Sequence, residues 1–407
     1  MKRWLFYIIT AAATATTAIL IIFVILPRYY RMFERPAHGH CSIRLNRSIL
    51  DRSLEVGTQF LLNHQKPEGH FTYQYDWMDK TYAQGDSQVR QAGVMWGLAL
   101  IYQDEPNPKV KAAVEKAMDF FALHSKVTAD GDRYVVYPGD NTGSTGTVAL
   151  CALAHIEYLR TPSTDASQEK LQNYRQHLNE YLEFLVGART QTGLWHRFYD
   201  ISDGRPFGSS TPYYDGESLL ALVKAAKYMG REDLQPIIID AAEAGYQHNI
   251  LEALQEDRDS PVTKGYYQWS SMAFFELATT KWPDTKKYGN YVIELADWMI
   301  HVHKTLERRR NTGYAYEGII HAYQLAVKQV DIKHVKKFTC VIDVGLEKLT
   351  SWQVGGPLAN RFIRRQATTD PLAIGGVQNH RRESPLRLDV TQHQMHAVIL
   401  ARRYVYK

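Results

Sequence analysis

The chain has 407 residues, of which 45% are hydrophobic and 22% are charged, and this length allows one large core or two ordinary ones. Its 26 Tyr, 14 Phe and 8 Trp residues exclude a disordered chain, which is poor in aromatic residues. The net charge of +5 is smaller than that of a dedicated nucleic-acid-binding protein, so we expect no nucleic-acid partner. The three cysteines cannot build a disulfide framework, and no CxxC pair is present to hold zinc.

The first predicted element is an uncleaved membrane anchor. No charged residue occurs between Trp4 and Pro27, and an apolar helix of about 22 residues spans the roughly 30 Å hydrocarbon layer. A cleavable signal peptide is the alternative, but its apolar region is normally only about 7–15 residues long. We therefore expect an anchor over residues 1–27, with 4–26 in the membrane, and a juxtamembrane linker over 28–48.

The positive charges that flank this anchor are nearly balanced. Lys2 and Arg3 precede it, and Arg28, Arg31 and Arg35 follow it. The positive-inside rule therefore does not decide the orientation. The sugar chemistry described below favours a single-pass membrane protein with an extracytoplasmic body.

From residue 49 onwards, two kinds of helical segment alternate strictly. The first kind is amphipathic, with charges spaced along one face. These segments cover residues 49–65, 108–125, 170–189, 232–249, 285–305 and 334–352. The second kind is poor in charge and rich in Ala, Gly, Leu and aromatic residues. These segments cover residues 87–102, 142–158, 214–228, 267–279, 314–327 and 389–404.

This alternation predicts an all-α (α/α)6 toroid over residues 49–407, in one domain. A helix that is apolar all round must be covered on every side, so six such helices fit an inner ring that the six amphipathic helices surround. A helical repeat solenoid would alternate as well, but its inner segments would begin at regular intervals, and these do not. Only residues 133–137, RYVVY, resemble a short strand.

Carboxylates occur at or near the starts of the charge-poor segments, and in a toroid these ends meet at one mouth. The candidates for catalysis are Glu217, Glu317, Asp86, Asp215 and Asp389. Acids at such positions are also common helix caps: Asp140 precedes a predicted helix start, and Asp389 with Gln392 resembles a capping box. Glu217 and Glu317 are the leading pair, although an acid in a first turn also suits the helix macrodipole.

Aromatic residues accompany these acids. Those at the inner-helix starts are Tyr213, Tyr214, Tyr267, Trp269 and Tyr316. Aromatic faces stack on pyranose rings, and acids and amides bond the hydroxyl groups of sugars. The pattern therefore predicts a saccharide-binding site, open to an oligosaccharide or a polysaccharide.

The segment before the last helix holds six arginines between residues 361 and 387. A solvated basic face is the plain interpretation. Guanidinium groups also bind carboxylate or phosphate in planar contacts, so Arg364, Arg365 and Arg387 predict an anionic saccharide, with a lipid headgroup as the alternative.

Histidines give a weaker signal. His155 and His321 fall in mid-helix and are expected to be core or surface residues. His393 is the one histidine that we place among the binding residues. No HExxH spacing is present, so we expect no metal ion or other cofactor.

Tyrosine and acid at the inner-helix starts resemble the (α/α)6 carbohydrate-active enzymes, which include toroid glycoside hydrolases, unsaturated-glucuronyl hydrolases and sugar epimerases. The stretches Tyr-x-Tyr-Glu-Gly at 314–318 and Arg-Leu-Asp-Val-Thr-Gln-His at 387–393 are loosely similar to the C-terminal part of glucuronyl C5-epimerases. This resemblance implies a sugar-processing reaction and assigns no catalytic residue.

Three functions are compatible with the sequence. A glycoside hydrolase needs two carboxylates roughly 5–10 Å apart, which Glu217 and Glu317 would supply, and this function is favoured. A uronyl C5-epimerase or polysaccharide lyase needs arginine beside the sugar carboxylate and Tyr or His to move the proton. A noncatalytic glycan-binding or assembly protein would keep the aromatic residues without paired acids.

Overall fold

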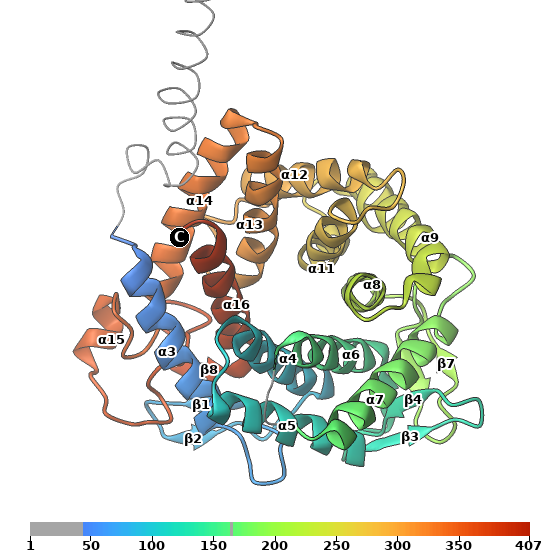
Figure 1. The fold of residues 1–407 in the computed structure, drawn as a ribbon. Coiled ribbons are helices and arrows are strands. Elements are labelled where there is room, and N and C mark those ends of the chain that lie inside the picture. The colour runs from blue at the N-terminus through green and yellow to red at the C-terminus, as the bar shows by residue number, and fades with distance from the viewer. Residues whose placement is uncertain (1–43, 163–165) are drawn as a thin grey trace, which may run out of the picture.

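The computed structural model describes residues 44–162 and 166–407, which form two concentric rings of helices (Figure 1). The inner ring consists of α4 (Gln88–Asp104), α6 (Thr145–Arg160), α8 (Pro212–Tyr228), α11 (Pro261–Ala278), α13 (Gly313–Lys328) and α16 (Leu388–Tyr404). The outer ring consists of α3 (Arg47–Asn63), α5 (Pro108–Leu123), α7 (Gln168–Gly187), α9 (Gln235–Tyr246), α12 (Lys286–His301) and α14 (Ile332–Thr350).

Contacts between neighbouring helices close the inner ring. Each inner helix packs against the next inner helix along the chain, and α16 packs against α4, so the last one meets the first. The outer helices cover the seams: α7 contacts both α6 and α8, and α12 contacts both α11 and α13. The predicted (α/α)6 toroid is therefore confirmed for the described residues.

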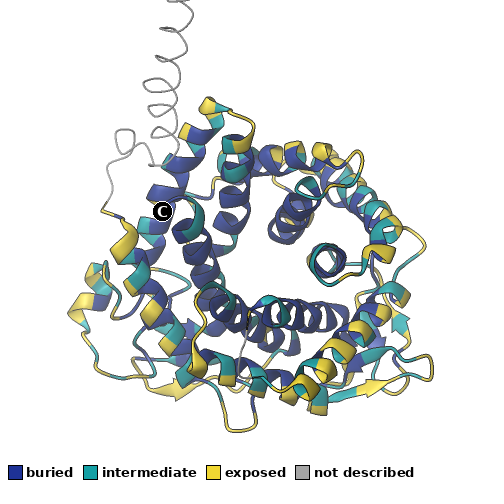
Figure 2. Ribbon diagram, in the orientation of Figure 1, coloured by how far each residue is buried: buried dark blue, intermediate teal, exposed yellow. Residues whose placement is uncertain are grey.

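Burial distinguishes the two rings (Figure 2). In α6 every residue from Thr145 to Tyr158 is buried, because inner helices flank it and outer helices lie behind it. In α7 the buried residues form one stripe, and the rest of the helix is mostly polar or charged and is exposed or partly exposed. This difference is why the inner segments are poor in charge and the outer ones amphipathic.

The two largest errors in the predicted helix boundaries fall in the fourth inner and the fourth outer segments. α11 begins at Pro261 rather than at residue 267, because Ser260 accepts a hydrogen bond from the Val262 amide and Pro261 suits the first turn. The fourth outer segment is longer than expected and irregular. It comprises a 3-10 turn (Glu232–Leu234), α9, a π-helical turn (Gln247–Glu252) and α10 (Ala253–Glu256).

Short antiparallel strands fix the connections between the rings. The pairs are β1 (Gln74–Asp76) with β2 (Thr81–Tyr82) and β8 (Pro385–Arg387), β3 (Ser125–Val127) with β4 (Arg133–Val135), and β6 (Phe198–Asp200) with β5 (Thr142–Ser144) and β7 (Pro206–Phe207). The strand predicted at 133–137 corresponds to β4. Pairing of β8 with β1 sets Arg387 opposite Gln74 and so fixes the chain directly before α16.

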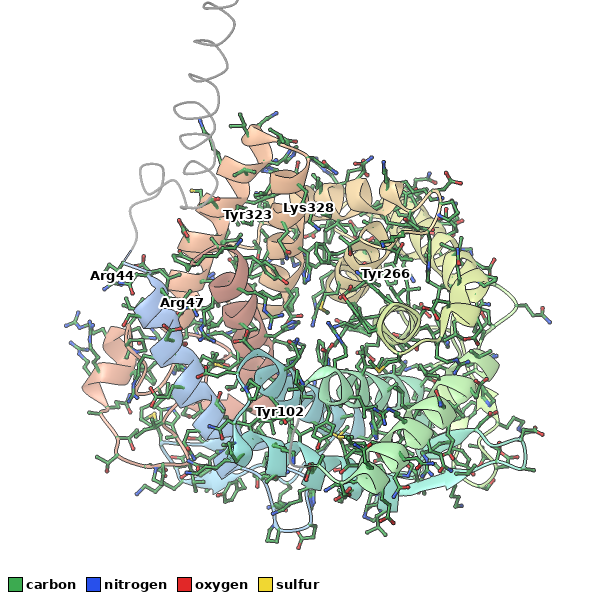
Figure 3. All side chains as sticks on the ribbon, viewed as in Figure 1. Arg44, Arg47, Tyr102, Tyr266, Tyr323 and Lys328 are labelled. Carbon is green, nitrogen blue, oxygen red and sulfur yellow. The ribbon has the colours of Figure 1, made fainter. Side chains whose placement is uncertain are left out.

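The beginning and the end of the described chain are tied together beside α3 (Figure 3). Arg44 donates a 2.9 Å hydrogen bond to Glu347 of α14, and Arg47 donates to the carbonyl oxygens of Arg402 and Tyr406 at 2.9 and 3.1 Å. The predicted anchor lies outside the described residues. Among the helices of residues 44–162 and 166–407, none is both long and apolar enough to cross a membrane.

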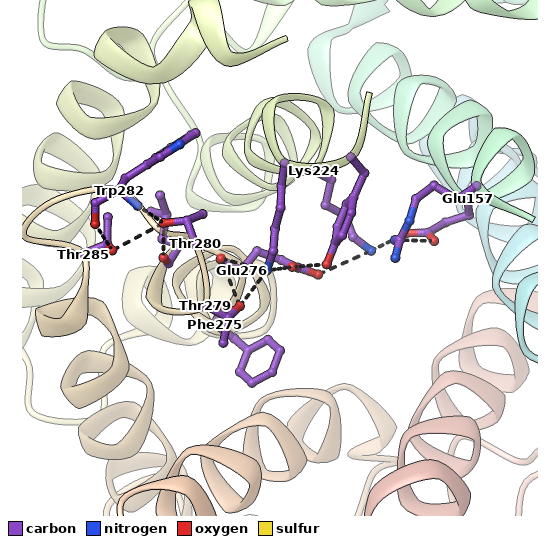
Figure 4. Close-up of polar contacts among 12 residues, drawn as sticks. Glu157, Lys224, Phe275, Glu276, Thr279, Thr280, Trp282 and Thr285 are labelled. Carbon is purple, nitrogen blue, oxygen red and sulfur yellow. Dashed lines mark hydrogen bonds and ion pairs between the residues drawn. The ribbon is translucent and has the colours of Figure 1, made fainter. Parts of the chain in front are cut away.

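At the C-terminal ends of α6, α8 and α11, buried charges pair with one another (Figure 4). Lys224 lies between Glu157 and Glu276 and forms an ion pair with each. Lys227 Nζ lies 2.7 Å from Oε2 of Glu276. Although burial alone would raise the pKa of Glu276, Lys224 and Lys227 lower it to about 2, because nearby cations favour the carboxylate. We call this set of side chains the paired end of the barrel.

Candidate active site

The opposite, N-terminal ends of the inner helices surround a cavity of about 960 Å3. Each inner helix contributes to the wall from its N-terminal half. One such residue from each helix in turn is Arg90, Leu150, Glu217, Trp269, Tyr314 and His393. The predicted convergence of these ends at one mouth is therefore what the structure has, and a volume of this size is typical of ligand sites.

Aromatic side chains from three inner helices cluster next to this cavity. The ring of Trp96 (α4) lies 5.2 Å from that of Trp269 (α11) and also 5.2 Å from that of His396 (α16). All three residues are buried, and Trp269 also lines the cavity. Trp269 is therefore the ring of this cluster that a sugar in the cavity can contact.

His393 reaches the cavity from α16 with a buried carboxylate behind it. Its Nδ1 lies 3.1 Å from Oε1 of Glu317, a fully buried residue of α13. Gln268 donates to Oε2 of Glu317 at 2.7 Å, and Nδ1 of His396 lies 3.4 Å from Oε1. Although burial alone would raise the pKa of Glu317, His396 and His393 lower it to about 2. With Nδ1 beside the carboxylate, Nε2 of His393 is left to exchange a proton with a ligand.

Glu217 of α8 places a second carboxyl group at the cavity, and its pKa is shifted in the opposite direction to that of Glu317. The residue is 3% exposed, lines the cavity, and its Oε2 has no hydrogen-bond partner within the described chain. Burial raises the pKa of Glu217 well above its usual value, because no cation offsets the loss of water. A carboxyl group that keeps its proton at a cavity wall can act as an acid.

Asp389 is bound by two arginines at the cavity wall. Arg387 donates to both carboxylate oxygens of Asp389, from Nε at 3.0 Å and also from Nη2, and Nε of Arg90 lies 3.4 Å from Oδ2. The predicted capping box is wrong, because α16 begins after Arg387 and has no side-chain cap. Asp389 therefore holds two guanidinium groups in place, and together the three groups keep a positive charge.

Cationic side chains predominate in the wall. They are Arg90, Arg197, Lys264, Arg308, Arg309, Arg310 and Arg387. The carboxylates among the described lining residues are Glu217 and Asp389. Over residues 44–162 and 166–407, Arg197, Lys264 and Arg309 have no carboxylate at ion-pair distance. The cavity therefore carries an excess of positive charge toward a ligand.

Of these cations, Arg387 is the one predicted from the sequence. Arg308, Arg309 and Arg310 stand together directly before α13, and this run was a visible signal. Arg90 is the only charged residue in the N-terminal half of α4. Arg308 is held in place from below, because Asp259 and the His303 carbonyl accept from its guanidinium, both at 2.7 Å.

Asp86, a predicted candidate, lies outside the cavity. Its carboxylate accepts from Gln91 at 2.7 Å and from the Tyr137 hydroxyl at 2.6 Å, which fixes the turn before α4. Asp140 does not cap α6 either, since that helix begins at Thr145, and its carboxylate accepts from Gln88. These acids organise the loops around the mouth.

Asp215 also lies away from the cavity, although it is only two residues before Glu217. It is buried and accepts hydrogen bonds from the Trp195 amide at 3.0 Å and the Asn249 side chain at 3.1 Å. Burial raises its pKa to about 7. Glu317 is walled off behind His393, so the leading pair Glu217 and Glu317 does not face one common space.

Three of the predicted aromatic residues line the cavity: Tyr213, Tyr214 and Trp269. Tyr267 instead points between α11 and α13, where its hydroxyl donates to the Ala315 carbonyl at 3.0 Å. Tyr316 packs against α14, where Gly345 leaves space for it; a Cβ at that glycine would lie 1.7 Å from the Tyr316 hydroxyl. The expectation that Tyr267 and Tyr316 bind substrate is corrected accordingly.

Of the predicted arginines, Arg387 lines the cavity and Arg364 and Arg365 do not. Both belong to α15 (Arg361–Arg365), which Asn360 caps and which buries only Ile363. α15 lies on the outside of the toroid (Figure 1), and both Arg364 and Arg365 are exposed there.

The mid-helix histidines belong to the core, as expected. Nδ1 of His155 lies 2.8 Å from the Cys151 carbonyl, and Nδ1 of His321 lies 2.5 Å from the Glu317 carbonyl. In the described part of the chain, no group of three or more His, Cys, Asp or Glu side chains is arranged to hold a metal ion.

Known proteins resemble this chain in structure and not in sequence. No protein-family model and no curated protein sequence matches it. A sugar epimerase from a ruminal bacterium has a TM-score of 0.60 at 11% identity, covering 88% of this chain and 98% of its own. Cellobiose 2-epimerase from Bacillus thermoamylovorans has a TM-score of 0.59 at 13% identity, covering 86% and 98%.

A third structure comes from the glycoside hydrolases. An inactive α-1,6-mannanase of Salegentibacter, solved in complex with α-1,6-mannotetrose, has a TM-score of 0.59 at 9% identity, covering 88% of this chain and 99% of its own. The resemblance to (α/α)6-toroid carbohydrate-active enzymes is thereby confirmed at the level of the fold. The closer likeness to glucuronyl C5-epimerases stays a prediction.

Proposed function

We propose that the protein is a carbohydrate-active enzyme that moves a proton at the carbon next to the carboxylate of an acidic sugar, as a uronyl epimerase or lyase does. The observation that carries this proposal is the His393–Glu317 pair at the wall of a cationic cavity. From the sequence, this reaction is the alternative to a glycoside hydrolase. The hydrolase built on Glu217 and Glu317 loses its support, because Glu317 is buried behind His393.

Substrate binding follows from the charges of the wall. Arg197, Lys264 and Arg309 have no carboxylate partner within residues 44–162 and 166–407, so an anionic sugar would supply the missing charge. The N-terminal ends of six inner helices add partial positive charge at the same mouth. Buried Nε2 of Gln392 lines the wall without a described partner and would bond a sugar hydroxyl.

The base in this proposal is His393. Nε2 takes the proton from the carbon next to the sugar carboxylate, and the electron pair of the broken C–H bond moves into the carboxylate as an enolate. Cations beside the sugar carboxylate stabilise that charge. Glu317 stabilises the imidazolium that forms and fixes the ring through Nδ1.

The acid in this proposal is Glu217. An epimerase returns a proton to the same carbon from the opposite face, and a lyase protonates the departing glycosidic oxygen instead. Glu217 suits either step, because burial raises its pKa and its Oε2 has no described partner. The two residues reach the cavity from α8 and α16, which are separated in the ring by other inner helices.

The test is incubation of the protein with a panel of uronate polysaccharides in deuterium oxide. An epimerase incorporates deuterium into intact chains, a lyase gives unsaturated ends, and a hydrolase gives new reducing ends without deuterium at carbon. We expect His393→Asn to abolish deuterium incorporation or unsaturated ends. His301→Asn, an exposed histidine at the end of α12, is the matched control. Undiminished proton exchange in His393→Asn contradicts the proposal.

One observation favours a glycoside hydrolase as a second candidate. Glu217 and Asp389 are the two carboxylic side chains among the described lining residues, and such an enzyme needs one neutral acid and one charged carboxylate. New reducing ends, lost in both Glu217→Gln and Asp389→Asn but retained in His393→Asn, would favour the hydrolase.

We also propose an extracytoplasmic position for the toroid, on an anchor over residues 4–26. Cys340 on α14 is disulfide-bonded, whereas Cys151 is free and buried, and disulfides persist in oxidising compartments. The test is protease treatment of intact cells that express the full chain. Degradation of the toroid before lysis supports the proposal, and full protection until lysis contradicts it.

A further inference from the structure

A second cationic surface continues from the cavity over the rim of the toroid. A hollow of about 480 Å3 shares Arg308 and Arg309 with the cavity. A third hollow of about 460 Å3 shares Arg381 and Arg382 with the second. The three hollows are therefore contiguous, and we call the two outer ones the rim track.

The rim track is held in place by hydrogen bonds between two loops. The backbone of Arg310 pairs with that of His380, and the Asn311 amide donates to the Asn379 carbonyl at 2.7 Å. This pairing lays the run 308–310 beside Arg381 and Arg382. Lys348 of α14 fastens the same loop from below, because its Nζ donates to the Arg308 carbonyl at 2.6 Å.

Charge in the rim track is mostly uncompensated. Arg309, Arg381 and Arg382 are exposed, and over residues 44–162 and 166–407 none of them has a carboxylate at ion-pair distance. Glu383 pairs with Arg310, and the lining residue Glu307 lies 4.0 Å from Lys304. Trp352 and His380 add rings to the same floor, 6.5 Å apart. Guanidinium groups beside aromatic rings suit successive sugars that each carry an anionic group.

We infer that the substrate is a polymer with carboxylates on successive sugars, and that the rim track binds the units next to the one in the cavity. This inference rests on the proposed function for the choice of carboxylate. A short saccharide would occupy the cavity alone, whereas a longer chain would also reach Arg381 and Arg382.

The experiment measures binding to the full-length protein, without turnover. The probes are di-, tetra- and octasaccharides prepared from polygalacturonate and alginate, in which every sugar carries a carboxylate. We expect affinity to rise with length in at least one series. In Arg381→Ala/Arg382→Ala the octasaccharide of that series should bind about tenfold more weakly, with a shallower dependence on salt. Arg381→Lys/Arg382→Lys keeps the charge and should lie in between.

Arg364→Ala/Arg365→Ala is the matched control, because it removes the same charge from exposed positions outside the rim track. Binding that is independent of length overturns the inference, and so does an equal loss in both double variants. A different outcome is that Arg381→Ala/Arg382→Ala binds the octasaccharide normally but loses a preference for phosphatidylglycerol over phosphatidylcholine vesicles. That result assigns the rim track to lipid headgroups and also overturns the inference. Proton exchange by His393 tests the proposed function separately, so either idea can fail alone.

Discussion

The two ends of the inner barrel differ in whether their buried carboxyl groups have ion-pair or hydrogen-bond partners. At the paired end, Glu276 is held by Lys224 and Lys227, and its pKa falls to about 2 although burial alone would raise it. At the cavity end, burial raises the pKa of Glu217 well above its usual value, and no described donor reaches its Oε2. The same fold therefore has fully paired buried carboxylates at one end and a buried carboxyl oxygen without a described partner at the other.

This difference indicates where a ligand belongs. Buried polar groups are nearly always bonded. Unpaired ones reduce stability, so proteins keep them chiefly at functional sites. The paired end needs no ligand, because its acids and cations match one another (Figure 4). The cavity end lacks such matching, and four kinds of change test the contrast.

The largest effect is expected at the cavity end. Glu217→Gln cannot donate a proton and should lower turnover by about 10²- to 10⁴-fold, with little change in the melting temperature. In the unmodified protein turnover should fall as the pH rises through the raised pKa of Glu217, because the proposed acid acts in its neutral form. The exposed residue Glu169 of α7 gives the control Glu169→Gln. Unchanged turnover in Glu217→Gln would rule out Glu217 as the acid.

Breaking the paired end should affect stability instead. Lys224→Met leaves Glu157 and Glu276 with fewer cationic partners in a buried place and should cost about 3–5 kcal/mol of unfolding free energy. Turnover per folded molecule should stay the same. Denaturant unfolding measures the first quantity, with the exposed Lys109→Met as control. Lys224→Met/Glu157→Gln should recover part of the loss, and no recovery would argue against charge pairing as the cause.

Asp215 and Glu217 are both buried at the N-terminal end of α8, but both carboxylate oxygens of Asp215 accept hydrogen bonds. Asp215 therefore tests what burial does to a carboxyl group that has partners. Its pKa is raised to about 7 in the folded state, so the folded protein binds a proton more tightly than the unfolded chain. The resulting stability is complete below about pH 4 and is lost as the pH rises to about 7, an effect of about 4 kcal/mol. Asp215→Asn should flatten this dependence in urea unfolding at several pH values. An unchanged slope in the variant would contradict the assignment.

The smallest effect is expected from Gly146 on α6. A Cβ there would lie 2.3 Å from Oε2 of Glu217 and 2.4 Å from the ring of Tyr214. Gly146→Ala should therefore displace both side chains and lower turnover about tenfold, with a stability change within about 1–3 kcal/mol. Gly289→Ala on α12 meets only ordinary contacts, at 3.5 Å, and serves as control. Equal activity in both variants would show that the position of Glu217 is unimportant.

The sequence predicts the toroid because a helix that is buried on every side contains few charged residues, and each inner helix shows this composition. It predicts side-chain directions less well. Moving from Tyr267 to Gln268 turns a side chain by about 100° around the helix, and that step separates a residue packed between helices from one that contacts His393. The pairing of Arg310 with His380 is likewise invisible, because it joins loops far apart in the chain.

Ring closure by α16 has a consequence for shortened chains. This helix supplies His393 and Asp389, and it also completes the barrel by packing on α4 and α3. A variant cut before Leu388 would have neither the imidazole of His393 nor a closed ring of inner helices. Loss of this one helix would therefore remove two cavity residues and open the barrel at the same time.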